Sequence, residues 1–351
     1  MGADDQEETK PSDRMRGRVS GGRLKLWVLL EADRWAVSAG MLAIVFVALV
    51  ASGAVDPSPL RRLMSSKDPV ETALQPYVGA IITGVTLVVT INQLVLSQEL
   101  GAVGDQRERM SEAMDFREDV ADALGVSASP PDPATFLQAL VDNSAAVAAD
   151  LEDAAADAPD SAREGIDELV DAVQVNADEV SDQLDGARFG TFSVVSAALN
   201  YNYSWKLYHA RRLRNEYADD LSREAVEKLD QLVRTLAFFG PAREHVKTLY
   251  FQWELINLSR AMLYTAVPAI VVTTGSILYV DASAVTGTYL GVDAIVWTVS
   301  GLTALALMPF SVLAAYVLRI ATVAKRTLAI GPFILRSTDR SANRDWDDQW
   351  D

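Results

Sequence analysis

The sequence predicts an all-α membrane protein with four transmembrane helices and a large cytoplasmic helical insertion between the second and third spans. Two observations support this fold class. Half of the 351 residues are hydrophobic while the net charge is −17, which indicates that apolar and acidic residues are separated along the chain. The apolar residues gather in four stretches, and the acidic residues gather between the second and the third stretch.

The first predicted span covers residues 36–55, which contain no charged side chain. At a rise of about 1.5 Å per residue, a helix of this length crosses a hydrocarbon layer of about 30 Å. Residues 78–97, 261–280 and 290–318 form three further spans; the last contains one acid, Asp293, which we expect at the outer membrane boundary. A buried core helix would explain one such stretch, but it explains four poorly. A cleaved signal peptide would have a shorter apolar run than the first span.

Basic residues beside the spans predict the orientation, because such residues stay preferentially on the cytoplasmic side. They are Arg14, Arg16, Arg18, Arg23, Lys25 and Arg34 before the first span, and Arg319, Lys325 and Arg326 after the fourth. We therefore expect a multi-pass protein of the cell membrane with both termini cytoplasmic, in the segments 1–35 and 319–351. Residues 22–34 are a candidate interfacial helix. The outer loop 56–77 and the outer turn 281–289 then lie outside, although Arg61, Arg62 and Lys67 in the loop argue against this orientation.

The cytoplasmic insertion, residues 98–260, is strongly acidic in its first part. Between residues 97 and 191 there are 23 acidic and 5 basic residues, a net charge of −18, which disfavours nucleic acid as a partner. Residues 132–187 predict an acidic helical hairpin. Asp132 is placed to cap its first helix, Pro159 to end that helix, and a capping box beginning at Ser161 to start the second helix.

Along the second helix of the hairpin, apolar residues recur at alternating steps of four and three, as in a coiled coil. They are Ile166, Val170, Val173, Ala177, Val180 and Leu184. Such a hairpin is either a solvated structural stalk or an arm that docks a protein partner or concentrates cations.

The rest of the insertion is nearly neutral and rich in aromatic residues such as Tyr201, Tyr203 and Trp205. We expect these residues to pack in a core; packing on the inner membrane surface is the alternative. A helix is predicted over residues 221–239, ended by Gly240 and Pro241. The next helix is expected to run without a break from the cytoplasm into the third span.

The second span contains the most suggestive pattern, because its small and polar residues recur at steps of four and three and so share one helix face. They are Gly79, Thr83, Thr86, Thr90, Gln93 and Ser97. In a bilayer this polar stripe would face another helix or line a path for ions. Helix packing is the structural interpretation, with Gly84, Gly275 and Gly301 allowing close approach.

Pro268 and Pro309 lie inside the third and fourth spans, where each removes one helical hydrogen bond. The carbonyls of Tyr264 and Leu305 lose their usual partner, so we expect a kink at each position. These kinks either serve as hinges in gating or simply shape the bundle.

Nothing in the sequence indicates a catalytic, cofactor or metal site. The chain has no cysteine and only two histidines, His209 and His245. It contains no glycine-rich phosphate loop, no paired His and Glu metal helix and no Gly-x-Ser-x-Gly turn. We therefore expect a protein that is not an enzyme and that uses no cofactor.

The composition is typical of extreme halophiles, since the 31 basic residues include 24 Arg and the 48 acidic residues include 31 Asp. The segment 81–100, IITGVTLVVTINQLVLSQEL, resembles uncharacterised four-span membrane proteins of halophilic archaea. The order of two spans, a helical insertion and two spans also resembles, in topology alone, bestrophin-type anion channels and more loosely flagellar-stator and TolQ-like proton channel subunits. These resemblances imply a membrane location, and they assign no activity and no functional residue.

Two functional hypotheses follow. In the first, the protein is an oligomeric ion channel or transport-related protein built from copies of this chain, in which the second span lines the path. In the second, it is a non-conducting sensor or scaffold that the lipid bilayer anchors and whose acidic hairpin binds a protein partner.

Overall fold

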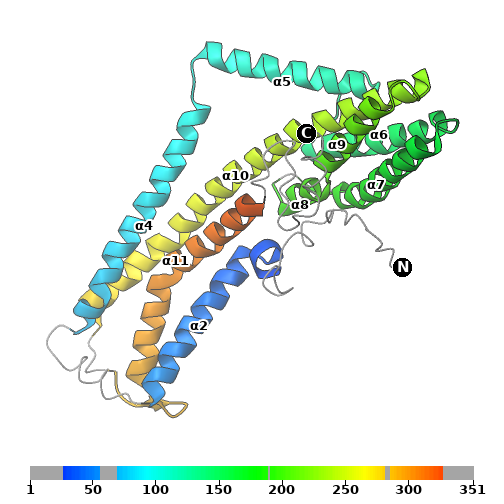
Figure 1. Ribbon diagram of the computed structural model, residues 1–351. Coiled ribbons are helices and arrows are strands. Elements are labelled where there is room, and N and C mark those ends of the chain that lie inside the picture. The colour runs from blue at the N-terminus through cyan, green and yellow to red at the C-terminus, as the bar shows by residue number, and fades with distance from the viewer. Residues whose placement is uncertain (1–26, 56–68, 189, 281–284, 327–351) are drawn as a thin grey trace, which may run out of the picture. The chain divides into compact units, whose positions relative to one another are not determined.

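The computed structural model describes residues 27–55, 69–188, 190–280 and 285–326 (Figure 1). Helices dominate this part of the chain, so the predicted all-α class is confirmed. The described residues fall into two compact units. Unit 1 contains residues 109–248, and unit 2 contains the described residues up to 108 together with residues 249–324. Each unit is described by itself below.

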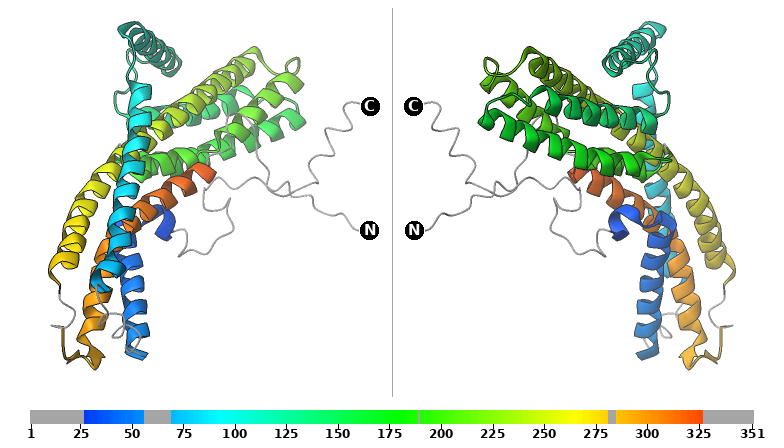
Figure 2. Two further views of the ribbon diagram at one scale, coloured as in Figure 1. Left: turned by 90° about the vertical axis from the view of Figure 1, so that its left-hand side faces the viewer. Right: turned by 90° about the vertical axis from the view of Figure 1, so that its right-hand side faces the viewer.

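Unit 2 contains four helices that are long and apolar enough to cross a membrane, which agrees with the four predicted spans. They are α2 (Arg34–Val55), α4 (Pro69–Glu99), the C-terminal part of α10 (Arg223–Tyr279) and α11 (Ala294–Arg326), preceded by one π-helical turn, η1 (Trp27–Glu31). Figure 2 shows the blue α2 and the orange α11 running alongside each other. The candidate interfacial helix at 22–34 is described only from residue 27 onward, where η1 takes its place.

The packing within unit 2 places α4 against α10 and α11. Ile81 of α4 packs with Ala266 and Ala269 of α10, and Val88 packs with Met262 of α10 and Val312 of α11. Outside these contacts, large apolar side chains cover much of the surface of unit 2. They include Ile44, Leu94, Val271, Leu278 and Val317. An exposed apolar surface of this extent is typical of a lipid-facing bundle.

The fourth span begins later than predicted. Residues 288–293 form a small hairpin, β1 (Thr288–Tyr289) and β2 (Val292–Asp293), and α11 starts at Ala294. The two turn residues between the strands have positive φ angles, 53° at Leu290 and 78° at Gly291, as a tight hairpin turn requires. Asp293 is buried, and its Oδ1 accepts a hydrogen bond from the amide of Ile295. The expected position of Asp293 at the outer membrane boundary stays a prediction, and the structure adds that its carboxylate caps α11.

Unit 1 is an assembly of shorter helices. They are α6 (Pro133–Ala154), α7 (Asp160–Leu184), α8 (Phe192–Asn200) and α9 (Tyr203–Glu216), with the C-terminal part of α5 (Val103–Leu124) and the N-terminal part of α10. Asp132 caps α6 as predicted, since its carboxylate accepts from the amides of Ala134 and Thr135. The predicted capping box is wrong: α7 begins at Asp160, and Pro159, at its N-cap position, makes no side-chain cap.

The hairpin of α6 and α7 is part of the core of unit 1. The apolar seam predicted along α7, from Ile166 to Leu184, is buried. The two helices pack on each other, and α7 also packs on α8 and α9. The hairpin is therefore not a free-standing stalk, because its apolar face is covered by other helices of the same unit.

The predicted break at Gly240 and Pro241 is wrong, since α10 continues through both residues to Tyr279. One face of this helix stays buried on both sides of the pair, with Leu236 and Phe239 before it and Ala242 after it. That burial compensates for the hydrogen bond that Pro241 cannot donate. Gly240 also lies in a close contact, because a Cβ atom there would stand 3.1 Å from the ring of Tyr203.

Candidate functional site

The polar stripe of α4 is the main candidate site, and the structure brings its members together on one exposed face of the helix. All six predicted residues are exposed: Gly79, Thr83, Thr86, Thr90, Gln93 and Ser97. The buried residues of the same helix, Leu74, Ile81, Gly84 and Val88, lie on the opposite side at about 100° per residue. The stripe therefore faces away from α10 and α11 of its own chain.

The hydroxyl groups of the stripe bond to the backbone of their own helix. Thr83, Thr86 and Thr90 each donate to the carbonyl four residues earlier, at 2.8 to 2.9 Å, and Ser97 donates to the carbonyl of Leu94 at 2.7 Å. These bonds allow a hydroxyl to exist in an apolar environment without a partner on another helix.

Of the three glycines that were expected to allow close approach of helices, Gly84 lies in a helix contact within the described residues. At Gly84, an added Cβ would lie 3.4 Å from the Phe310 ring of α11 and 3.8 Å from Met262 of α10, so this glycine sits in a helix contact. Among the described residues no atom lies within 4 Å of such a Cβ at Gly275 or Gly301, so neither glycine allows the predicted close approach between helices within this part of the chain.

The two candidate hinge residues lie within continuous helices. Pro268 is in α10, and Pro309 is near the middle of α11, which changes direction along its length (Figure 1). Close to Pro309, the hydroxyls of Ser311 in α11 and Ser38 in α2 share a buried hydrogen bond of 2.7 Å. This bond fixes α2 to the part of α11 that follows the proline. A hinge function stays a prediction.

A buried network of charged and aromatic side chains in unit 2 was missed by sequence reasoning. Nη2 of Arg34 donates to Oε2 of Glu254 at 2.6 Å and to the hydroxyl of Tyr250 at 3.1 Å. The guanidinium of Arg34 also lies 5.4 Å from the ring centroid of Tyr316. Arg319 is buried and donates to the backbone carbonyl of Ala32. The network joins α2, α10 and α11.

Arg34 and Arg319 support the predicted orientation as charges at the span boundaries, and that role does not indicate which residues they contact. One signal was available, because Glu254 is the one acid between Glu244 and Asp281, a stretch of otherwise mostly apolar residues. A solitary acid beside a membrane span needs a buried cationic partner. The identity of that partner could not be predicted, since Arg34 is separated from Glu254 by 220 residues.

The interior of unit 1 contains a second polar cluster. Lys206 is fully buried; its Nζ donates to Oδ1 of Asn176 at 2.7 Å and lies 4.8 Å from the ring centroid of Tyr201. Asn176 also accepts from the amide of Asn202 and donates to the carbonyl of Asn200. Tyr201 and Tyr203 are buried as well, which confirms the expected core packing for these two residues, whereas Trp205 is only partly buried and Tyr208 is exposed.

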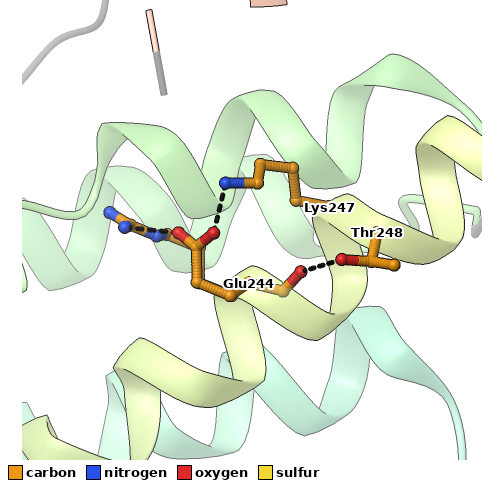
Figure 3. A network of polar contacts seen from close by, with 4 residues as sticks. Glu244, Lys247 and Thr248 are labelled. Carbon is orange, nitrogen blue, oxygen red and sulfur yellow. Dashed lines mark hydrogen bonds and ion pairs between the residues drawn. The ribbon is translucent and has the colours of Figure 1, made fainter. Parts of the chain in front are cut away.

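A third polar group lies on α10 in unit 1. Glu244 bonds to two cations: its Oε1 accepts from Arg243 at 2.7 Å, and its Oε2 accepts from Lys247, as Figure 3 shows for the lysine. Thr248 donates to the backbone carbonyl of Glu244 at 2.9 Å. Burial opposes ionisation of Glu244, but the hydrogen bonds and charges of Lys247 and Arg243 outweigh it, so the pKa of this carboxyl is lowered.

The two histidines do not form a metal site in the described part of the chain. His209 stacks on Trp205 with ring centroids 4.8 Å apart, and His245 is exposed on α10. The described residues contain no group of three side chains that would hold a metal ion.

Comparison with known proteins gives a family but no function. No curated protein and no solved structure matches the chain. A family profile matches residues 1–348, which is nearly the whole sequence. The chain therefore belongs to the family of unknown function DUF7972.

Proposed function

We propose that the protein is an oligomeric ion-conducting membrane protein in which α4 of several copies lines the path. The single observation that supports this proposal is the position of the polar stripe. Thr83, Thr86, Thr90 and Gln93 lie on the face of α4 opposite its contacts with the same chain. In a lone chain this face would meet lipid.

A lipid-facing position suits the stripe poorly. The Thr hydroxyls are satisfied within the helix, but the carboxamide of Gln93 brings polar atoms that an apolar environment does not solvate. Contact between α4 helices of neighbouring copies removes the stripe from lipid, and water between those helices solvates it. Both arrangements require an oligomer.

The proposal includes a cell-membrane location, with the four long helices as spans and both termini in the cytoplasm. The basic residues before α2 and after the fourth span support this orientation. Unit 1 then lies in the cytoplasm, between the second and the third span.

The test is ionic current across planar bilayers that contain the purified full chain at molar salt. Thr86→Leu puts a bulky apolar side chain in the middle of the stripe, so we expect it to abolish the current while chemical crosslinking still shows the oligomer. Leu87→Phe is the matched control, because it adds bulk to an exposed residue of the same helix outside the stripe. It should leave the current intact.

A silent wild type that crosslinking shows to be inserted and assembled would refute conduction. The alternative is then a non-conducting sensor or scaffold that binds a partner through the hairpin of α6 and α7. Several carboxylates of this hairpin are exposed, among them Asp142, Asp153, Asp167 and Asp178. Changing them to Asn should abolish co-purification of a partner. These surface changes leave the core of unit 1 intact, whereas deletion of the hairpin would remove part of that core.

A further inference from the structure

The connection between the third and fourth spans contains a folded and uncharged segment. Residues 285–292 have no charged side chain, and the hairpin of β1 and β2 occupies most of this segment. β2 contacts α2, and the hairpin lies beside α2 and α11 at one end of unit 2 (Figure 1). Because the chain leaves α10 at Tyr279 and enters α11 at Ala294, the hairpin is tied to the ends of two spans.

The tip of this hairpin departs from the residue preference of its turn. Leu290 has a φ of 53°, a left-handed conformation that glycine and asparagine adopt readily and that strains other side chains. A two-residue turn with positive φ at both positions favours Asn-Gly, so Leu290 stands where asparagine is common. Leu290 is 79% exposed and Tyr289 is 67% exposed, so packing within the described part of the chain does not offset this strain. A contact outside the chain would offset it.

A line of aromatic rings sets the depth of the tip. Nε1 of Trp297, in the first turn of α11, donates to the carbonyl of Tyr289 at 3.0 Å, and the two ring centroids are 6.2 Å apart. The Trp297 ring also contacts the ring of Phe46, with centroids 5.8 Å apart. Phe46 lies about 13 Å along α2 from the end of that helix at Val55. The hairpin is therefore folded back beside the spans, and Tyr289 joins a tryptophan at the level where such residues meet lipid headgroups.

We infer that Tyr289 and Leu290 insert into the lipid bilayer at the outer boundary of the spans. The tip has no charge, its two side chains are exposed, and its aromatic contacts keep it beside the apolar surface of unit 2. At this depth an apolar side chain exchanges water for the glycerol and acyl region of the lipids, which favours insertion. The inference rests on the proposed membrane topology and does not depend on ion conduction.

The test is hydroxyl-radical footprinting of the purified full chain in phosphatidylcholine liposomes, with radicals generated on both sides of the membrane. Mass spectrometry gives the oxidation of each residue relative to its intrinsic reactivity. Val175 on α7, which is 71% exposed, is the reference for water, and Ile44 on α2, which is 72% exposed, is the reference for lipid. Because burial of a leucine side chain shifts a two-state equilibrium about tenfold or more, we expect Tyr289 and Leu290 to be oxidised about tenfold less than Val175.

Leu290→Asn tests the role of the leucine at the tip. Asparagine suits the positive φ angle, so the turn is kept while the apolar side chain is lost. Oxidation of Tyr289 should then rise toward the level of Val175. Thr286→Asn is the matched control, because it changes another exposed, uncharged residue of the same segment outside the turn. It should leave the oxidation of Tyr289 unchanged.

Leu290→Cys identifies what covers the tip, since the chain has no other cysteine. We expect a fluorophore on this cysteine to be quenched by nitroxide-labelled lipids and to be shielded from iodide in the water. Disulfide formation between copies, without quenching by the lipids, would identify a second copy of the chain as the occupant and overturn the inference.

The footprint of the wild type separates failure of the inference from failure of the topology. Oxidation of Tyr289 and Leu290 at the level of Val175, with Ile44 protected, would overturn the inference and leave the four spans in place. Oxidation of Ile44 at the level of Val175 would contradict the proposed topology, and the inference with it. An unchanged footprint of Tyr289 in a folded Leu290→Asn variant would also overturn the inference, since the leucine would then not hold the tip in lipid.

Discussion

The contact between α2 and α11 near the end of α2 depends on a glycine. A Cβ atom added at Gly53 would stand 2.6 Å and 2.9 Å from the two Cγ atoms of Val296, whereas ordinary contact begins at 3.4 Å. Val296 is 1% exposed, so no free space surrounds its side chain. Because it is β-branched and lies in a helix, it also has no second rotamer of low energy. Gly53→Ala must therefore move α2 away from α11 or strain Val296.

The magnitude follows from two opposing terms. Overpacking of a filled contact costs about 1–3 kcal/mol, while replacing a helical glycine by alanine gains up to about 1 kcal/mol. Gly40 lies on the same helix, and no atom of the described residues stands within 4 Å of its added Cβ, so Gly40→Ala receives the gain alone. Because the gain cancels between the two variants, Gly53→Ala should be less stable than Gly40→Ala by about 1–3 kcal/mol.

Thermal unfolding of the purified protein in detergent measures this difference, at about 2–4 °C per kcal/mol for a domain of 150–250 residues. The cost of Gly53→Ala should shrink in a Val296→Ala background, because the smaller side chain leaves room for the added methyl group. Equal midpoints for Gly53→Ala and Gly40→Ala, or an unchanged cost in the Val296→Ala background, would refute the reasoning.

Three further predictions concern unit 1. Because the pKa of Glu244 is lowered in the folded protein, the stability that its ionised carboxylate contributes is present above the ordinary value of 4.5 and is lost as the pH falls through the lowered value. In acid unfolding followed by circular dichroism, the wild type should lose this stability and the Glu244→Gln variant should not. Asp132→Ala removes the cap of α6 and should cost about 1 kcal/mol in urea unfolding, with Asp160→Ala, at an uncapped helix start, as the control. Asn176→Ala leaves the amide of Asn202 and the carbonyl of Asn200 without this partner and should cost about 2 kcal/mol or more by the same assay; a loss below about 0.5 kcal/mol would show that water replaces the carboxamide.

The spans and the stripe could be predicted because both depend on local sequence. A run of uncharged residues long enough to cross a bilayer is visible without knowledge of its neighbours, and Thr83, Thr86 and Thr90 share a face through helical periodicity alone. The cap at Asp132 is local in the same sense.

The wrong predictions concern positions that distant residues decide. Gly240 and Pro241 usually end a helix, but burial of α10 on both sides of the pair outweighs that local preference. The role of Asp293 as the cap of α11 was not predicted, because the apolar run from residue 290 was expected to form one helix. The pairing of Arg34 with Glu254 required knowledge of which helices pack together, which one sequence does not contain.

The direction of four hydrogen atoms affects what the polar stripe of α4 offers to an ion. Thr83, Thr86, Thr90 and Ser97 each have one hydroxyl hydrogen, and each donates it to a carbonyl of its own helix. The lone pairs of these oxygens remain, which solvate a cation and offer nothing to an anion. Within the stripe, the amide nitrogen of Gln93 still presents hydrogens. Replacing Gln93 by glutamate would leave a face made wholly of oxygen acceptors.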